Sequence, residues 1–372
     1  MIGRRSEARR RAVTLSAILW VLIASGCAGE MSASPKPAGA VQDGAISQRP
    51  FVFRSRNELV LATAERVIAR HPGHYIDSGF AQDDSHVFAL DAAGRLTALE
   101  TTAGTVLANR IDCRCDRVFP LHDTVLGWWQ QPDTFVQADL RDPNSPARTP
   151  ISLPPPRDPI APGNVLSPPR LLAADARTLV IDRVESPPGA TWGINHLFVT
   201  ETATGATRPL ARVEGINTAL TAAALHPDGR SVALPGYRRD GTACGTARVL
   251  TVETAAGGTE NLDLPELARC STLTDLRWND TVLTGAVLSW EPGSPDRLTT
   301  SAVWARRESR WERCGGDDAL RCLPLTASSV LEIRRPGHDR VHTAHPGDLV
   351  LATGTESRVL ARDVVDIHLA RR

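Results

Sequence analysis

The chain has 372 residues, and its 42 basic and 42 acidic side chains give a formal net charge of zero. This balance excludes the strong positive field typical of nucleic-acid-binding domains, so we expect no nucleic-acid partner. The length allows two ordinary domains or one large domain built from repeats.

The first 26 residues have the pattern of a secretion signal. Basic residues stand near the start, and an uncharged stretch then runs from Ala12 to Gly26. This stretch is shorter than the roughly 20 apolar residues that span a bilayer comfortably, so it predicts a cleaved signal. Cys27 follows it directly. An ordinary signal peptide cut near Ala28 is the alternative.

The segment Ala24-Ser25-Gly26-Cys27 resembles the lipobox of bacterial lipoproteins. The resemblance implies that the Cys27 thiol receives a diacylglyceryl group and becomes the new N-terminus. It also implies a lipid anchor in the cell membrane, with the protein on the extracytoplasmic side. Residues 27–50 are rich in Ser, Pro, Ala and Gly, which predicts a flexible tether.

Residues 51–372 contain short apolar runs separated by turn residues, which predicts an all-β domain. A turn aspartate precedes an apolar run at intervals of about 40 to 60 residues, the repeat length typical of β-propeller blades. Aspartate suits such turns because its carboxylate accepts hydrogen bonds from nearby backbone N–H groups. The recurring aspartates are Asp84, Asp123, Asp175, Asp228, Asp280 and Asp339.

The repeats predict a seven-bladed β-propeller. Six units are complete, and the two chain ends supply a seventh. Segment 58–70 closely repeats segment 348–362, while the strand 364–369 resembles 74–80. We therefore expect the C-terminal strand to join the N-terminal blade and close the ring. The complete units cover about residues 74–110, 116–153, 169–213, 216–264, 273–316 and 324–362.

The segment His226-Pro227-Asp228-Gly229-Arg230, followed by an apolar strand, resembles the turn box of the WD40-like repeats in TolB-type propellers. The resemblance implies an extracytoplasmic propeller of binding type. It carries no catalytic residues over to this chain.

Acidic residues stand at comparable positions of the predicted innermost strands. If they converge at one mouth of the channel, they could bind a cation or a basic peptide. The alternative is that each carboxylate caps a local turn or pairs with an arginine of the adjacent blade. These residues are Asp77, Asp275, Asp366 and, as a looser match, Glu332.

Trp128 and Trp129 are a second ligand-binding candidate. Each indole has a broad apolar face and a polar N–H, so the pair could stack against a sugar or a peptide. Packing between blades is the alternative.

Six cysteines follow Cys27, and an even number in an exported chain predicts disulfides. Pairing between neighbours is the simplest of several possible connectivities: Cys113 with Cys115, Cys244 with Cys270, and Cys314 with Cys322. A redox or metal site at Cys113-Arg114-Cys115 is the alternative for the first pair.

The sequence contains no nucleophile elbow, dinucleotide loop or phosphate loop. His338, His342 and His345 lie in a segment with the pattern of a turn and a strand, so we expect surface histidines there. We expect no metal, no cofactor and no catalytic residue. The sequence thus favours a lipid-anchored module that binds a protein, peptide or glycan. An exported propeller enzyme, such as a hydrolase, lyase or quinone-dependent dehydrogenase with its active site at the channel mouth, is the alternative.

Overall fold

The protein was analysed as a computed structural model. It describes residues 48–107, 111–190, 193–215, 223–238, 244–265, 270–293, 298–326, 328–336 and 346–371, which all belong to one compact unit from Gln42 to Arg372. The predicted signal peptide, Cys27 and most of the tether lie outside the described residues. Within the described ranges, no helix has the length and apolar character needed to cross a bilayer.

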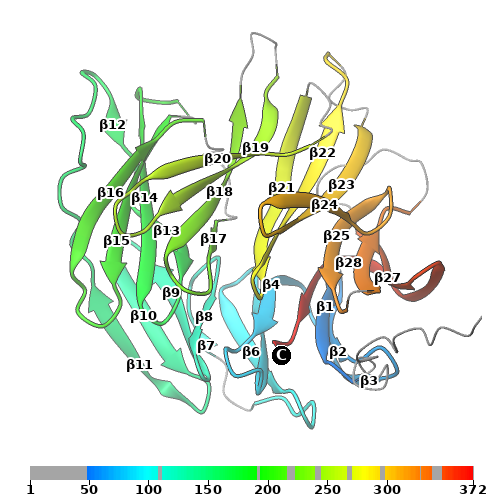
Figure 1. Ribbon diagram of the computed structural model, residues 1–372. Helices are drawn as coiled ribbons and strands as arrows, with labels where there is room; N and C mark the ends of the chain where they lie inside the picture. Colours follow the sequence, from blue (N-terminus) through cyan, green and yellow to red (C-terminus); the bar gives the residue numbers. More distant parts are fainter. Residues whose placement is uncertain are drawn as a thin grey trace, which may run out of the picture. The chain divides into compact units, whose positions relative to one another are not determined.

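Five antiparallel sheets follow one another along the chain (Figure 1). The first contains β4 (Tyr75–Phe80), β5 (His86–Asp91), β6 (Arg95–Glu100) and β7 (Ile111–Asp112). The second contains β8 (Phe119–His122), β9 (Val125–Gln130), β10 (Thr134–Asp139) and β11 (Asp142–Pro150). The third contains β12 (Val165–Leu166), β13 (Arg170–Ala174), β14 (Thr178–Ser186), β15 (Ile194–Glu201) and β16 (Thr207–Val213).

The fourth sheet contains β17 (Ala224–Leu225), β18 (Ser231–Arg238), β19 (Thr246–Glu253) and β20 (Thr259–Asp263), and the fifth contains β21 (Cys270–Asn279), β22 (Val282–Trp290), β23 (Leu298–Arg307) and β24 (Arg310–Cys314). A sixth sheet has seven strands and unites the two ends of the unit. Its order is β25 (Ala319–Pro324), β26 (Ser329–Arg334), β27 (Gly347–Thr353), β28 (Glu356–Leu369), β1 (Phe51–Ser55), β2 (Glu58–Ala62) and β3 (Val67–Pro72).

The long strand β28 joins the chain ends as the sequence predicts. Its first half pairs with β27, with Arg358 opposite Leu351, and its second half pairs with β1, with Ile367 opposite Phe53. The prediction that the C-terminal strand completes the N-terminal blade is therefore confirmed. This pairing leaves no open edge on β1.

The innermost strands contact one another around a ring. β8 contacts β13, and the contacts continue through β17, β21, β25 and β28 to β4. A hydrogen bond from the Val118 backbone N–H to the Asp77 carboxylate, at 3.2 Å, links β4 to the start of β8. Sheets arranged radially around such a ring of innermost strands define a β-propeller.

The recurring aspartates form turns between innermost and second strands. Asp84, Asp123 and Asp280 adopt positive φ angles of 57°, 43° and 52°. Asp175 Oδ1 instead accepts hydrogen bonds from two backbone N–H groups of its turn, each at 2.7 Å. The carboxylate or the tolerance of aspartate for this backbone region explains the recurrence. Asp339 lies outside the described residues.

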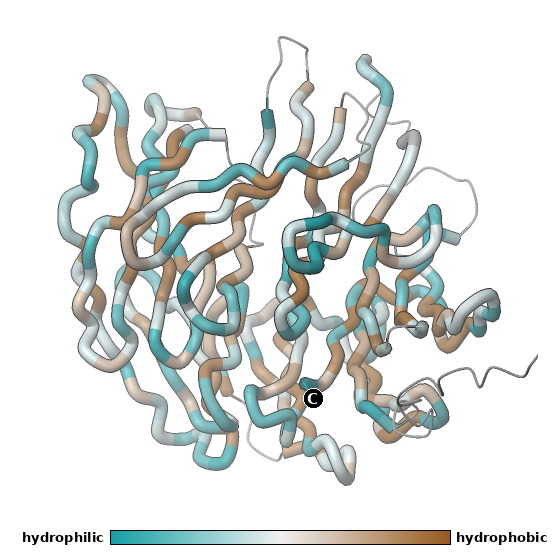
Figure 2. The backbone as a smooth tube through the Cα atoms, viewed as in Figure 1, coloured by the Kyte–Doolittle hydropathy of each residue, from teal (hydrophilic) through white to brown (hydrophobic). Residues whose placement is uncertain are grey.

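The core consists of apolar clusters between successive sheets. Figure 2 shows the hydrophobic residues along the strands that contribute to it. Both faces of a strand contribute, because a propeller sheet is covered on each side. In β1, Phe51 and Phe53 face the β25–β28 side, while Val52 faces β4 and β5. The alternation follows from the two-residue period of a strand.

One predicted unit needs a correction. The last complete unit was expected to begin near residue 324, but its innermost strand is β25, which begins at Ala319. Glu332 consequently lies on the second strand, β26, not on an innermost strand. The turn after β25 contains Thr326 and Ser328, and no aspartate marks it. The aspartate pattern therefore does not mark the turn between the first two strands of this unit.

Candidate functional site

Three of the four predicted acidic residues come together on innermost strands. Asp275 lies on β21, Asp366 on β28 and Asp77 on β4. Arg277 and Arg321 lie between the first two carboxylates. The group therefore combines carboxylates and guanidinium groups from successive sheets.

Arg321, on β25, links Asp366 of its own seven-stranded sheet to Asp275 of the fifth sheet. Its Nη1 lies 2.5 Å from Asp366 Oδ1 and 3.4 Å from Asp275 Oδ2. Arg277 runs parallel to this bridge, with Nε 2.7 Å from Asp275 Oδ2 and Nη2 3.2 Å from Asp366 Oδ1. Arg277 Nη1 also donates to the Ile367 carbonyl at 2.9 Å. The four side chains form a charge network that connects β21, β25 and β28.

The electrostatics of this network favour ionised carboxylates. Burial opposes ionisation of Asp366, but Arg321 and Arg277 outweigh it and hold the pKa of that carboxyl well below its usual range. Burial likewise opposes ionisation of Asp275, and the same two arginines lower its pKa. Burial disfavours the charged form of Arg277, yet Asp275 and Asp366 raise its pKa. The side-chain charges of these residues are thus satisfied within the protein.

Asp77 has a different environment. Its carboxylate accepts hydrogen bonds from the backbone N–H groups of Ser78 and Val118, at 2.9 and 3.2 Å. Burial raises the pKa of Asp77, and the nearby charge of Arg117 only partly offsets this effect. Asp77 therefore links two sheets mainly through hydrogen bonds to the backbone.

The space within the charge network is very small. The cavity lined by Asp275, Arg277 and Arg321 has a volume of about 10 Å³. That is the space of a single water molecule, far below the volume of a ligand pocket. The network connects blades through arginine pairs, which is the alternative the sequence left open for these acids.

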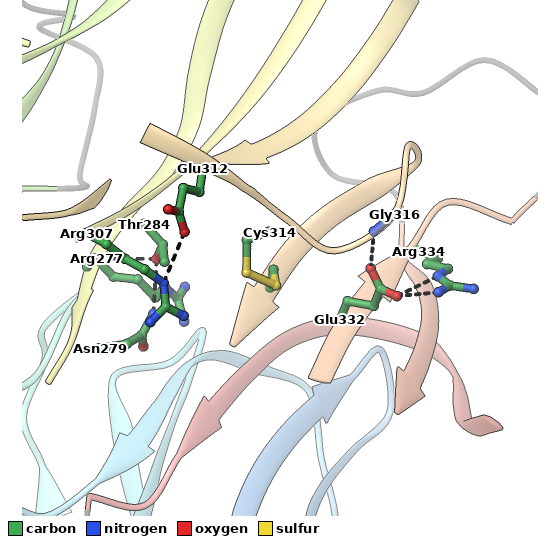
Figure 3. Close-up of a disulfide and its surroundings, with 10 residues drawn as sticks. Arg277, Asn279, Thr284, Arg307, Glu312, Cys314, Gly316, Glu332 and Arg334 are labelled. Carbon is green, nitrogen blue, oxygen red and sulfur yellow. Dashed lines mark hydrogen bonds and ion pairs between the residues drawn. A yellow bond between two sulfur atoms is a disulfide. The ribbon is translucent and has the colours of Figure 1, made fainter. Parts of the chain in front are cut away.

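Glu332 lies apart from the other acids, because it is on the second strand of its sheet. Its carboxylate accepts a hydrogen bond from the Gly316 backbone N–H at 2.7 Å and pairs with Arg334 Nη2 at 2.5 Å. Figure 3 shows these contacts on the side of the Cys314–Cys322 disulfide opposite to Arg277. The fully buried Glu332 thus fixes a local turn.

The two tryptophans are also buried and lie on the second strand, β9. Trp128 packs into the cluster between the first two sheets, and Trp129 packs into the next cluster. Their exposed fractions are 2% and 8%. Since the side chains alternate along the strand, the two rings face opposite sides of the sheet. Neither ring offers an open face for stacking.

The six cysteines form three disulfides: Cys113–Cys115, Cys244–Cys270 and Cys314–Cys322. In the described ranges, no three His, Cys, Asp or Glu side chains form a group that could hold a metal ion. His338, His342 and His345 lie outside these ranges.

A larger pocket lies between the second and third sheets. Its volume is about 320 Å³, within the range of small-ligand sites. Its walls combine apolar side chains with an amide, two hydroxyl groups and a guanidinium group. The lining residues are Gln131, Ser167, Pro168, Pro169, Arg170, Val184, Ser186 and Ala190.

An ion pair with a fully buried carboxylate holds one wall of this pocket in place. Arg170 Nε and Nη2 contact the two oxygens of Asp182 at 2.8 and 2.7 Å. Asn195 Nδ2 donates to the same carboxylate at 2.6 Å. Asp182 has an exposed fraction of 0%, so Arg170 provides its charge compensation. This pairing fixes the guanidinium group at the edge of the pocket.

Glu185 anchors the loop that leads into the pocket. It accepts hydrogen bonds from Ala161 N at 2.8 Å, Asn164 Nδ2 at 2.9 Å and His196 Nε2 at 2.7 Å. The hydrogen bond with His196 is the main reason that the pKa of Glu185 is lowered to about 2. Sequence reasoning missed this residue and Asp182. Their position inside the apolar run of β14 is the signal that could have revealed them.

Several solved structures are similar to this chain. Oligogalacturonate lyase in complex with manganese is 13% identical, with a TM-score of 0.50, covering 84% of this chain and 85% of that chain. BamB from Moraxella catarrhalis is 14% identical, with a TM-score of 0.42, covering 77% and 91%. The RRP9 WD40 repeats are 9% identical, with a TM-score of 0.48, covering 83% and 92%.

No family model and no curated protein matches the chain. At these identities the structural likeness concerns the fold alone. The strand order and the ring of contacts place the chain among the β-propellers, a fold that is commonly a binding scaffold.

Proposed function

We propose that this chain is a lipid-anchored, extracytoplasmic β-propeller that binds a protein, peptide or glycan and does not act as an enzyme. The observation that carries the proposal is the contrast between two spaces. The charge network encloses only about 10 Å³, whereas the pocket at Pro168 and Arg170 offers about 320 Å³ with mixed apolar and polar walls. A pocket of this volume and composition suits recognition of a ligand.

The proposed anchor is Cys27, on the strength of the lipobox-like segment that precedes it. Replacing Cys27 by Ser should move the protein from the detergent-rich phase to the aqueous phase in detergent phase partitioning, because a serine cannot carry the thioether-linked lipid. Equal partitioning of the variant and the parent protein would contradict the anchor and leave the proposed pocket untouched.

We further propose that the propeller has seven blades. The 14-residue strand β28 serves two sheets in succession, so the seven-stranded sheet divides into two blades of four strands. The apolar clusters support this count. They lie at each of the interfaces that seven blades would make, including one between the two halves of the seven-stranded sheet.

The pocket favours a ligand that presents hydrogen-bonding groups beside apolar surface. Pro168, Pro169 and Val184 supply the apolar surface. Ser186 and Gln131 add polar groups from two different sheets, so a ligand would contact both blades at once. The backbone and side chains of a peptide, or the hydroxyl groups and ring faces of a sugar, have this combination of groups.

The test is a photo-crosslinker placed at position 186, in the pocket wall, in intact cells of the source organism. A matched control carries it at position 308, an exposed turn residue between β23 and β24. We expect a defined adduct at position 186 that is missing at position 308. Identical adducts at both positions, or turnover of a defined substrate by the purified domain, would overturn the proposal.

A further inference from the structure

The disulfide between Cys113 and Cys115 differs from the other two in the loop that it closes. Its sequence separation is 2, against 26 for Cys244–Cys270 and 8 for Cys314–Cys322. A disulfide restricts the unfolded chain less as the closed loop shortens, so this bond contributes the least loop entropy of the three. Stabilisation of the fold is therefore a weak reason for its presence.

The two sulfur-bearing residues are not equally accessible. Cys113 is 2% exposed and belongs to the apolar cluster between the first two sheets. Cys115 only packs against the border of that cluster and is half-buried. The pair follows β7, the outermost strand of its sheet, where a macromolecule can approach. An incoming thiolate would thus reach Cys115 before Cys113.

The backbone of this loop is held independently of the disulfide. The Gly94 carbonyl accepts hydrogen bonds from the N–H groups of Cys113 and Arg114, at 2.9 and 3.2 Å. Gly94 has φ +76°, and a Cβ there would lie 2.8 Å from the Arg114 Cα, so the turn and the loop touch backbone to backbone. Reduction would leave these contacts in place. The two thiols would stay close enough to form the disulfide again.

The residue between the cysteines favours the exchange through its charge. The exposed guanidinium group of Arg114 favours a thiolate on the adjacent Cys115. The Asp112 carboxylate, 3.5 Å from Arg114 Nε, offsets part of this charge, but both side chains are well exposed to solvent.

We propose that Cys113–Cys115 is a thiol–disulfide exchange site that accepts two electrons from a dithiol of a partner polypeptide. A partner thiolate attacks Cys115 Sγ, the disulfide breaks, and Cys113 leaves as a thiolate that takes up a proton. The second partner thiolate then attacks the partner's own sulfur in the mixed disulfide and releases Cys115. The partner loses two electrons and two protons and gains a disulfide, while Cys113 and Cys115 become thiols. The reaction is stoichiometric and independent of the proposed binding pocket.

The first test needs no variant. The purified protein is equilibrated with graded dithiothreitol, alkylated, and analysed by peptide mass spectrometry. We expect Cys113–Cys115 to open at a dithiol concentration about tenfold lower than the other two pairs, with the circular dichroism of the fold unchanged. Opening of Cys113–Cys115 together with or after the other disulfides would overturn the proposal.

The second test compares single variants that leave one free thiol each. With an aromatic disulfide as the probe, Cys115 in Cys113→Ser should react about tenfold or more faster than Cys113 in Cys115→Ser. The matched controls are Cys314→Ser and Cys322→Ser, whose remaining cysteines are both buried and should both react slowly. Equal rates for Cys113 and Cys115 in folded variants would contradict the assigned order of attack.

Discussion

Replacing Arg321 by Ala should destabilise the propeller strongly, because this side chain bridges two carboxylates on neighbouring sheets. Its Nη1 lies 2.5 Å from Asp366 and 3.4 Å from Asp275, and the Asp366 side chain is only 8% exposed. Removal of one partner from a buried ion pair costs about 3–5 kcal/mol, since the remaining charge loses its compensation. Arg277 still contacts both carboxylates in the variant, at 2.7 and 3.2 Å. We therefore expect a loss of about 2–4 kcal/mol in the free energy of unfolding.

The matched control is Arg70→Ala. Arg70 pairs with Glu58 at 2.6 Å, almost the same distance, but the two side chains are 55% and 30% exposed. Exposed pairs contribute about 0–1 kcal/mol, so this variant should unfold nearly as the parent protein does. The assay is urea unfolding at pH 7 with intact disulfides, followed by tryptophan fluorescence and circular dichroism in parallel. Equal losses in the two variants would refute the argument that burial makes the Arg321 network strong.

Three further outcomes follow from the same structure. Asp77→Asn should have a free energy of unfolding within about 1 kcal/mol of the parent protein at pH 7. Because burial raises the pKa of Asp77 and disfavours its ionised form, the deficit of the variant in urea unfolding should be smaller at pH 7 than at pH 4. A large loss at pH 7 would show that the charge itself is needed. Glu185→Gln should lower the free energy of unfolding by about 2 kcal/mol at pH 7. Since the pKa of Glu185 is lowered from 4.5 to about 2, the stability advantage of the parent protein is complete above pH 4.5 and declines as the pH falls towards 2. A pH-independent difference in thermal unfolding would contradict this assignment. Truncation after Asp363 should prevent folding, because it removes the half of β28 that contains the buried Val364 and Ile367. Burial of each of these side chains contributes about 1.5–3 kcal/mol to the stability of the fold. A cooperative thermal transition in the truncated protein would contradict the closing role of β28.

The sequence predicts the architecture well, because propeller blades repeat and their turns need particular residues. The aspartate turns at Asp84, Asp123 and Asp280 follow from backbone geometry that few residues tolerate. The similarity of the two chain ends predicts the pairing of β28 with β1. The predicted start of the last unit, near residue 324, is wrong because the turn after β25 uses threonine and serine in place of aspartate.

The site was harder to predict, because partners of charged residues come from other blades. Asp275 and Asp366 converge as expected, but nothing in the local sequence reveals that Arg321 lies between them. Likewise, the pocket depends on the packing of a proline-containing loop against Gln131 of the previous sheet. Such contacts depend on the packing of whole sheets and not on residue spacing.

The pocket between the second and third sheets is the proposed ligand site of this propeller. The most direct measurement uses the partner recovered by crosslinking at position 186. Isothermal titration calorimetry compares its affinity for the parent domain with its affinity for Ser186→Trp, in which the indole fills the pocket. We expect measurable binding to the parent domain and a loss of at least about tenfold in affinity for the variant, with unchanged unfolding of the domain. Equal affinity of the two folded proteins would contradict the claim.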